Sequence, residues 1–423
     1  MKKSIYFFAA VITLLLTTTL QAQELPLKPR PDAFAPEVGQ PEPKAFNMAS
    51  SVDEMRQWDR YPTYNTYLSM MAQWAAAFPQ LCHVDTIGTS VQGRLILCMV
   101  IRGESSYQNV HPEFFYSSTM HGDEVTGYVM MLRLIDTLLH GYGTNTQYTE
   151  LINTVDIYIN PLANPDGTYF YSNNTIQGSM RYNANYVDLN RNYPDPFGTE
   201  PLDPQQPENT AMINYVSNHH FRMSANLHGG SEVMNYPWDS FTSLENPHPN
   251  SDWWQEVCKR FVDTSRTYNN NHFRDVTSSG YIAGGDWYVI PNGRQDYMNY
   301  YHNCLEMTME LSTDKKLNSD ELPEYWRFLQ HSLVNYIEEV RHLNNGTQGI
   351  GVADQRPLKV YPNPTRDKLL LSEAPTHEVQ VFNMQGQRVM LLPTGTRLVD
   401  LSTLPGGIYM LRSGSHTAKV VKQ

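Results

Sequence analysis

Residues 114–139 read FFYSSTMHGDEVTGYVMMLRLIDTLL, and this stretch decides the fold of the 423-residue chain. The apolar run Phe114–Ser117 predicts a buried strand, and apolar residues then recur at helical spacing over Val125–Leu139. The polar turn His121–Glu124 connects the two. The same alternation of strand and helix patterns continues over residues 61–344, which predicts an α/β domain with a mixed, mostly parallel sheet.

Similar patterns lie on both sides of this stretch. A helical apolar stripe runs over Tyr67–Phe78, and short strands are expected at Arg94–Ile101, Val155–Asn160, Met223–Leu227 and Cys304–Leu311. Ligands in α/β sheets bind at the carboxyl ends of the strands, so polar residues at those ends are the candidates for function.

The composition excludes several classes of protein. With 40% hydrophobic residues the chain can bury a large core, so it is neither disordered nor fibrous. Its formal net charge of −12 argues against nucleic acid as a partner, because a nucleic-acid-binding protein would present a basic face. At ~100–200 residues per domain, the length favours more than one domain.

The N-terminus has the pattern of a secretory signal peptide over residues 1–22. Two lysines precede the apolar run Ile5–Leu16, which is too short to span a membrane, and cleavage is expected after Ala22. Residues 23–55 are expected to form a proline-rich leader, either a plain spacer or an inhibitory pro-segment. No later stretch is long enough for a membrane span, so no transmembrane segment is expected in the mature chain.

The chain has four cysteines, which are too few for a disulfide-stabilised scaffold. Outside the cytosol they could form two disulfides, and the sequence does not choose among the possible pairings. They are Cys82, Cys98, Cys258 and Cys304.

A change of pattern marks a separate C-terminal unit. The α/β domain is expected over residues 56–345, and residues 346–354 form a linker rich in glycine and polar residues. Residues 355–423 contain short strand patterns separated by turns, which predicts a small all-β sandwich. Its expected strands are Lys359–Tyr361, Lys368–Ser372, Val379–Phe382, Arg388–Leu392 and Ile408–Arg412.

Three residues in the α/β domain could form a metal site. His121 and Glu124 could turn toward one point and offer a nitrogen and a carboxylate oxygen, although such a pair at a helix start is more often a cap or a solvated turn. His228 follows the strand Met223–Leu227 and precedes two glycines, which places it well as a third ligand. Zinc accepts this ligand set, and a catalytic zinc keeps a further position open for water.

The strand Cys304–Leu311 adds a candidate base. Alternation places Glu306, Thr308 and Glu310 on one face of a strand that is otherwise suited to burial. Two buried carboxylates are costly unless they are paired or functional. Glu310, nearer the carboxyl end, is the candidate general base beside a metal-bound water, and Glu306 is expected to be a buried structural partner.

Five blocks of sequence match one family in the same order along residues 60–340. They are His121–Glu124, Asn164–Gly167, Arg181–Asp195, Asn226–Ser231 with Asn235–Asp239, and Trp287–Tyr288 with Gln295–Tyr297 and Thr308–Leu311. In these blocks the chain resembles the zinc metallocarboxypeptidases, and among them the N/E (regulatory) subfamily. The resemblance implies an α/β/α sandwich and a zinc-dependent exopeptidase that hydrolyses the C-terminal residue of peptides and proteins.

The resemblance also implies a role for each matching residue. His121, Glu124 and His228 would bind one Zn²⁺, and Glu310 would deprotonate the metal-bound water. Arg181 would polarise the scissile carbonyl and stabilise the oxyanion, a role that suits a permanently charged guanidinium.

Three further residues would bind the end of the substrate. Asn190 and Arg191 would hold its terminal carboxylate, the arginine through two parallel hydrogen bonds. Tyr288 would close over the bound residue.

Two other matching positions imply a preference for C-terminal lysine or arginine. Asp239 lies eleven residues after the third ligand and Gln295 seven after the closing tyrosine, where the family sets its side-chain specificity. Asn292 and Arg294 depart from the subfamily pattern. Arg294 would either weaken a basic preference or point to solvent.

The C-terminal unit resembles the sorting domain of the type IX secretion system of Bacteroidetes-type bacteria. The resemblance rests on Val360–Pro364, Val379–Gly386, Leu401–Leu404 with Gly406–Tyr409, and Lys419–Lys422. It implies the secretion machinery as a partner, export across the outer membrane, and a secreted or cell-surface location. A generic immunoglobulin-like or carbohydrate-binding module is the alternative.

Two alternatives to the peptidase remain open at this point. The α/β domain could cut cell-wall stem peptides, as related folds do, or it could be a catalytically inactive peptide-binding surface protein.

Overall fold

The computed structural model describes residues 46–103 and 111–343 and, toward the C-terminus, residues 360–371, 374–375, 378–383, 388–413 and 416–423. The expected signal peptide, the leader up to residue 45 and the expected linker 346–354 lie outside the described residues. None of the helices in the described part is both long and apolar enough to cross a membrane.

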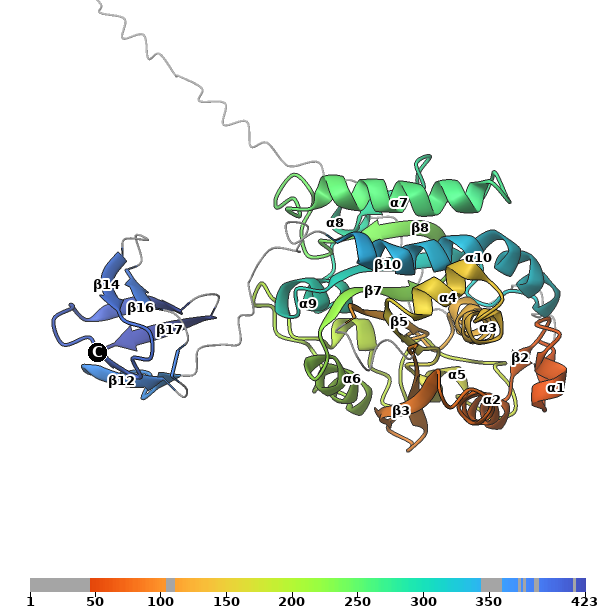
Figure 1. The fold of residues 1–423 in the computed structure, drawn as a ribbon, viewed down its shortest axis with the longest axis horizontal. Coiled ribbons are helices and arrows are strands. Elements are labelled where there is room, and N and C mark those ends of the chain that lie inside the picture. Colours follow the sequence, from red (N-terminus) through yellow and green to blue (C-terminus); the bar gives the residue numbers. More distant parts are fainter. Residues whose placement is uncertain are drawn as a thin grey trace, which may run out of the picture. The chain divides into compact units, whose positions relative to one another are not determined.

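One eight-stranded sheet forms the centre of the α/β unit. In sheet order its strands are β3 (Cys82–Thr89), β4 (Leu95–Ile101), β6 (Asp156–Asn160), β5 (Glu113–Ser118), β7 (Phe221–His228), β10 (Leu305–Ser312), β8 (Ser231–Tyr236) and β9 (Tyr281–Ala283). Strands β6, β5, β7 and β10 run parallel, whereas β3–β4, β4–β6 and β10–β8 are antiparallel pairs. The mixed, mostly parallel sheet is confirmed (Figure 1).

Helices cover both faces of this sheet. One face packs against α2 (Tyr64–Ala77), α3 (Thr126–Gly141), α4 (Thr146–Ile152), α7 (Ser251–Arg266) and α10 (Leu322–Glu338), and the other against α6 (Pro207–Ser217) and α9 (Arg294–Tyr301). Figure 1 shows α3, α4 and α10 on one side of the strands and α6 and α9 on the other, as an α/β/α sandwich requires. The shorter helices are α1 (Val52–Met55), α5 (Pro165–Thr168), α8 (Gly284–Trp287), η2 (Leu189–Arg191), η3 (Ser319–Glu321) and η4 (Glu339–His342).

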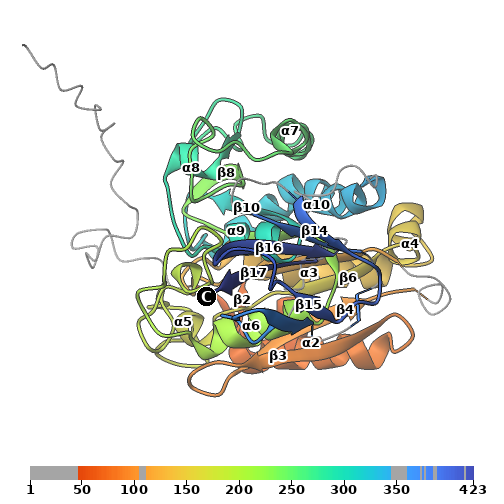
Figure 2. The same cartoon turned by 90° about the vertical axis from the view of Figure 1, so that its left-hand side faces the viewer.

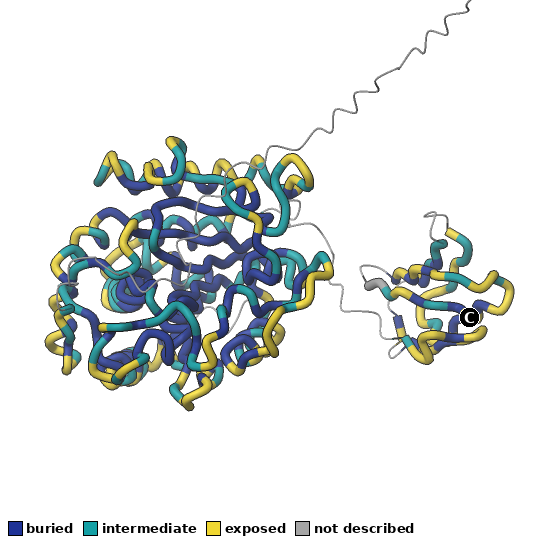
Figure 3. The backbone as a smooth tube through the Cα atoms, turned by 180° about the vertical axis from the view of Figure 1, so that it is seen from behind, coloured by how far each residue is buried: buried dark blue, intermediate teal, exposed yellow. Residues whose placement is uncertain are grey.

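Strand β5 shows why its sequence reads as a continuous apolar run. Phe114 and Tyr116 lie in the core shared with α3 and α10, whereas Phe115 lies in the second core, shared with α6 and α9. All three side chains are fully buried, because a parallel strand covered on both faces has no solvent side. In Figure 3 the strands at the centre of the unit are buried, and exposed residues lie on the surrounding helices and loops.

The ordered α/β unit begins earlier than the sequence predicts. Residues 46–55 were expected in the leader, but they form β1 (Met48–Ala49) and α1, and they bury Ala49 and Met55 in the main core. Strand β1 pairs with β2 (Tyr61–Pro62). The segment is too short to show periodicity, and its order comes from partners elsewhere in the chain.

The four cysteines are Cys82, Cys98, Cys258 and Cys304, and all are buried and free. The two disulfides that the sequence left open are therefore not formed. Burial raises the pKa of Cys82 to about 11, which keeps this thiol protonated and unreactive near pH 7.

The C-terminal unit consists of two antiparallel sheets that share one apolar core. The first is β11 (Val360–Tyr361), β12 (Lys368–Leu371) and β15 (Leu398–Asp400), and the second is β14 (Arg388–Leu392), β13 (Val379–Phe382), β16 (Gly407–Ser413) and β17 (His416–Lys422). Leu369, Val381 and Leu411 come from the two sheets and meet in the core. This confirms the small all-β unit, whose strands are drawn in dark blue in Figure 2.

A buried ion pair joins α9 to β10. Arg294 and Glu306 are both fully buried, with Nε 3.1 Å from Oε1, and Arg294 Nη2 donates to Oε2 at 3.1 Å. The guanidinium also lies 5.0 Å from the centre of the Phe115 ring. Arg294 therefore does not point to solvent, and its charge is compensated inside the core. Glu306 is a buried structural partner, as expected.

We predict that Arg294→Met lowers the free energy of unfolding at pH 7 by about 3–5 kcal/mol, because it leaves the Glu306 carboxylate buried without its partner. Burial already raises the pKa of Glu306, and without Arg294 it rises further, so the loss should become smaller as the pH falls and protonation removes the uncompensated charge. Urea denaturation measures both. In Arg294→Met/Glu306→Gln most of the loss should be recovered, and a double variant as unstable as the single one contradicts the pairing.

Candidate active site

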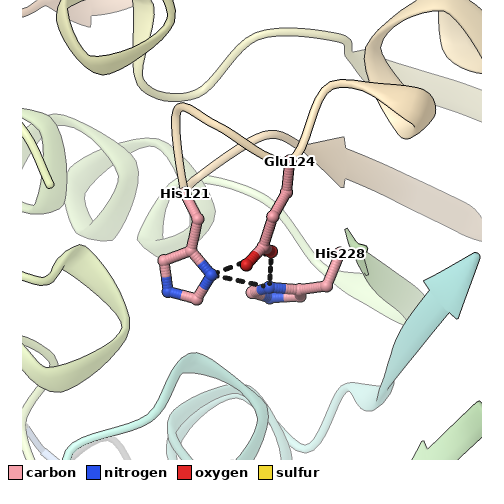
Figure 4. Close-up of side chains that lie close together, drawn as sticks. All are labelled: His121, Glu124 and His228. Atoms are coloured by element: carbon pink, nitrogen blue, oxygen red, sulfur yellow. Dashed lines mark hydrogen bonds and ion pairs between the residues drawn. The ribbon is translucent and has the colours of Figure 1, made fainter. Parts of the chain in front are cut away.

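His121, Glu124 and His228 come together in a single buried cluster, as the sequence predicts (Figure 4). Glu124 Oε2 lies 2.9 Å from His121 Nδ1 and 2.8 Å from His228 Nδ1, and the two nitrogens are 3.0 Å apart. Around a tetrahedral metal ion with bonds of about 2.0–2.2 Å the ligand atoms lie roughly 3.3–3.6 Å apart, so these three atoms are within reach of one ion and would move apart by roughly half an ångström to hold it.

Two segments far apart in the chain supply these side chains. His121 and Glu124 lie in the turn between β5 and α3, and His228 is the last residue of β7, the neighbour of β5 in the sheet. The turn is tightly held, since a Cβ added to Gly122 would lie 2.3 Å from the backbone of Gly167. After His228 the chain turns at Gly230, whose φ of +112° favours glycine.

The outer nitrogens of both imidazoles have partners of their own. His121 Nε2 lies 3.1 Å from Asp188 Oδ1, and His228 Nε2 lies 2.8 Å from the Asn226 amide. Among the described residues the amide oxygen of Asn226 is buried without a partner, and turning the amide over lets it accept the proton of His228 Nε2. Both Nδ1 atoms then face Glu124 Oε2, the orientation in which they could share one metal ion with it.

The protonation states also suit a metal ion. Burial raises the pKa of Glu124, but His121 and His228 outweigh it and hold that pKa well below its usual value, so Glu124 is ionised. Burial lowers the pKa of His228 to about 4, so this ring is neutral near pH 7. A carboxylate and a neutral imidazole are the forms that bind metals.

Glu310 lies beside the cluster on the next strand. In the parallel ladder of β7 and β10 it is the partner of His228. Its Oε2 is buried and has no hydrogen-bond partner among the described residues, so it remains available to a water or a substrate. Burial and the charge of Glu124 raise the pKa of Glu310 well above its usual value, as suits a general base that must also release its proton.

The second oxygen of Glu124 faces two cations. Arg181 Nη1 donates to Glu124 Oε1 at 3.3 Å, and Lys315 Nζ lies 3.5 Å from the same oxygen. Arg181 Nε also donates to Asp188 Oδ2 at 3.1 Å. Asp188 therefore orients both His121 and Arg181.

The expected carboxylate-binding residues lie at η2, close to this network. Asn190 N donates to Asp188 Oδ1 at 2.9 Å, and the Asn190 side-chain oxygen accepts from Arg294 N at 2.9 Å, which turns its amide nitrogen away from α9. Arg191 is half-buried, and its Nη1 donates to the Asn190 carbonyl at 2.8 Å. Burial and the charge of Glu310 raise the pKa of Tyr288, whereas Arg191 opposes the shift, so the tyrosine lies within the field of both residues.

Asp239 and Gln295 form a buried pair beside this region. Gln295 Nε2 donates to Asp239 Oδ1 at 2.7 Å, and Gln295 Oε1 accepts from Thr308 N on β10. Asp296 accepts from the backbone N–H of Asp239 at 2.8 Å. A Cβ added to Gly284 would lie 1.9 Å from Asp239 Oδ1, so the carboxylate packs directly against the backbone of Gly284 and only glycine fits at this position.

The similarity of the chain to known proteins agrees with this geometry. Residues 67–332 match the family model described as zinc carboxypeptidase. The chain belongs to the zinc carboxypeptidase family. The residues of the cluster fit the family's metal, because one carboxylate and two imidazoles, with a buried glutamate beside them, are a ligand set and a neighbouring carboxylate that a catalytic zinc uses.

The relatives are carboxypeptidases of the D, M and N types, which confirms the subfamily resemblance. Carboxypeptidase M of Mus musculus is 32% identical over 355 residues, 78% of this chain and 75% of that protein. Carboxypeptidase D of Anas platyrhynchos is 32% identical over 322 residues, 73% of this chain but 23% of the relative. The chain thus spans less than a quarter of the length of the carboxypeptidase D relatives.

Solved structures support the carboxypeptidase fold, and a second family model matches the C-terminal unit. Thrombin activatable fibrinolysis inhibitor superposes with a TM-score of 0.57 at 18% identity over 67% of this chain and 75% of that one. Carboxypeptidase A of Helicoverpa armigera superposes with a TM-score of 0.57 at 19% identity, over 68% of this chain and 75% of that one. Residues 359–423 match the secretion system C-terminal sorting domain.

Sequence reasoning missed four residues that surround the site: Asp188, Asn226, Asp296 and Lys315. The first three lie inside matching blocks, next to or two residues from a candidate, so the blocks themselves carried a signal. Lys315 lies outside every block, and only the folded turn after β10 brings it to Glu124.

We predict that the zinc-loaded protein, dialysed against zinc-free buffer, retains about one zinc ion per chain. His228→Ala should lose it, because the remaining two ligands no longer enclose the ion. Mass spectrometry of the metal content measures both. His83→Ala, which changes an exposed histidine paired with Asp85, is the control and should keep its zinc. Full zinc retention in His228→Ala contradicts the site.

Proposed function

We propose that the chain is a zinc-dependent carboxypeptidase that hydrolyses the C-terminal residue of peptides and proteins, preferentially lysine or arginine. The observation that carries this proposal is the cluster of His121, Glu124 and His228 with the unpaired carboxylate oxygen of Glu310 on the adjacent strand. The family membership of residues 67–332 supports the same reaction.

His121, Glu124 and His228 would hold the zinc ion, which would supply a Lewis acid to activate the attacking water and polarise the scissile carbonyl. Glu310 acts as the general base, taking a proton from the attacking water and returning it to the leaving amine as the peptide bond breaks. Its raised pKa suits both halves of this transfer.

Arg181 stabilises the negative charge that develops on the carbonyl oxygen. It remains charged near pH 7, and Asp188 fixes its guanidinium through Nε. Asn190 and Arg191 bind the terminal carboxylate and Tyr288 closes over the bound residue, which restricts the reaction to the last residue of a chain. The fixed Asn190 amide and the half-buried Arg191 supply donors for this carboxylate.

Asp239 confers the preference for a basic residue. Its carboxylate is buried, accepts a hydrogen bond from Gln295 and packs against Gly284. A cationic side chain placed there would compensate a carboxylate that otherwise lies next to Asp296. Arg294 does not oppose this preference, because Glu306 neutralises it.

The C-terminal unit directs the enzyme out of the cell. Its match to the secretion system C-terminal sorting domain supports recognition by the type IX secretion machinery and a secreted or cell-surface location. The expected signal peptide over residues 1–22 would deliver the chain to the periplasm first.

Glu310→Gln should lower kcat by about 10²–10⁴-fold without loss of zinc, because it removes the base and leaves the ligands in place. Release of the terminal residue from a peptide ending in arginine, together with zinc content, measures this. Glu324→Gln, at an exposed surface pair with Arg327, is the matched control. A Glu310→Gln enzyme that keeps more than a tenth of the activity rules out this role.

The preference for arginine over phenylalanine, expressed as a ratio of kcat/KM values, should rise between pH 5 and pH 8. Burial and the charge of Asp296 raise the pKa of Asp239, and burial raises the pKa of Asp296 to about 6. The pair is therefore largely neutral at the lower pH and gains negative charge as the pH rises. Titrations of enzyme groups that affect both peptides equally, such as that of the general base, cancel in this ratio.

Asp239→Asn is the variant that isolates this effect. It should lower kcat/KM for the arginine peptide by about ten- to a hundredfold, leave the phenylalanine peptide nearly unaffected, and flatten the pH dependence of the ratio. A preference for phenylalanine in the wild-type enzyme contradicts the basic specificity. Release of neither residue favours a cell-wall substrate or an inactive peptide-binding protein.

A further inference from the structure

Lys315 follows the end of β10 and reaches back to the metal-binding cluster. Its Nζ lies 3.2 Å from Asp123 Oδ2 and 3.5 Å from Glu124 Oε1. Its side chain is 23% exposed and that of Glu124 is 4% exposed, so water screens this pair only weakly.

The backbone and stem of Lys315 fix its position between the two ligand-bearing segments. Its carbonyl accepts from Val125 N at 3.0 Å, directly after Glu124 and at the start of α3. Its stem covers Gly230, where an added Cβ would lie 3.2 Å from Lys315 Cγ. Lys315 thus contacts both the turn that carries His121 and Glu124 and the turn that follows His228.

The two oxygens of Glu124 have separate partners. Oε2 faces the two imidazoles, whereas Oε1 is shared by Arg181 at 3.3 Å and Lys315 at 3.5 Å. In the proposed function Arg181 engages the carbonyl of the substrate, which weakens its hold on Glu124. Lys315 is tied to Asp123 and to Val125, so it can keep Oε1 paired throughout.

We propose that Lys315 is a positioning residue that holds Oε1 of Glu124, so that Oε2 stays directed at the metal while Arg181 turns to the substrate. Without this partner the buried carboxylate can rotate and its two oxygens become equivalent toward the ion. Residues that orient a ligand in this way typically change metal affinity or activity about 10–100-fold when they are removed. The catalytic part of this inference rests on the proposed function of Arg181, whereas the metal-binding part does not.

The test compares three variants of the full chain. Lys315→Met removes the charge and keeps a stem over Gly230, and Lys315→Arg keeps the charge. Lys316→Met makes the same change at the next residue, whose Nζ lies 6.0 Å from the Phe46 ring. Competition with a chromophoric chelator measures the dissociation constant for zinc, and urea denaturation of the zinc-free protein reports the fold. Release of a terminal arginine at saturating zinc gives kcat and KM.

Lys315→Met should weaken zinc binding by about 10–100-fold and lower kcat at saturating zinc, with KM little changed. Lys315→Arg should keep most of the wild-type zinc affinity and kcat, and Lys316→Met should match the wild type in both. Wild-type zinc affinity in Lys315→Met overturns the proposal, and weakened affinity with unchanged kcat overturns its catalytic part.

A further variant, Lys315→Gln, covers the case in which Lys315→Met does not fold. Lys315→Gln keeps N–H donors without the charge and should show the same loss of zinc affinity, so unchanged affinity there overturns the proposal equally. If the wild-type protein hydrolyses no peptide and Lys315→Met still loses zinc affinity, the proposed function is wrong and the role of Lys315 stands.

Discussion

The carboxylate of Glu124 is the group on which the rest of the site depends. One oxygen lies with His121 and His228 in a set of three atoms that could hold a metal ion, and the other accepts from Arg181 and approaches Lys315. A buried carboxylate is costly unless its charge is compensated. The cations around Glu124 supply that compensation, and they also fix the direction in which each oxygen points.

The sheet places these groups with little freedom. The turn after β5 and the end of β7 lie side by side because β5 and β7 are adjacent parallel strands, and the β7–β10 ladder pairs His228 with Glu310. A shift of one residue in that ladder would turn Glu310 to the opposite face of the sheet. The central strands are buried on both faces, so the cores that fix the sheet also fix the register of the site.

The fold could be predicted from the sequence because it depends on local patterns, such as the apolar run before His121. The candidate metal cluster could be proposed because the weak local signals at His121, Glu124 and His228 coincide with blocks that match one family. Residues whose role depends on distant contacts could not be predicted. Lys315 carries no local signal, and the sequence around Arg294 does not show that its partner is Glu306, 3.1 Å away in the core. Residues 46–55 are ordered only by partners elsewhere in the chain.

The central claim is that this chain folds into a ready-made zinc site with a free base beside it. Anomalous diffraction at the zinc absorption edge, from crystals of the zinc-loaded protein, tests it most directly. We expect a single strong peak about 2.0–2.2 Å from His121 Nδ1, His228 Nδ1 and one oxygen of Glu124, with Glu310 close to the ion but not bound to it. A peak held by other residues, or an ion bound directly by Glu310, contradicts the account.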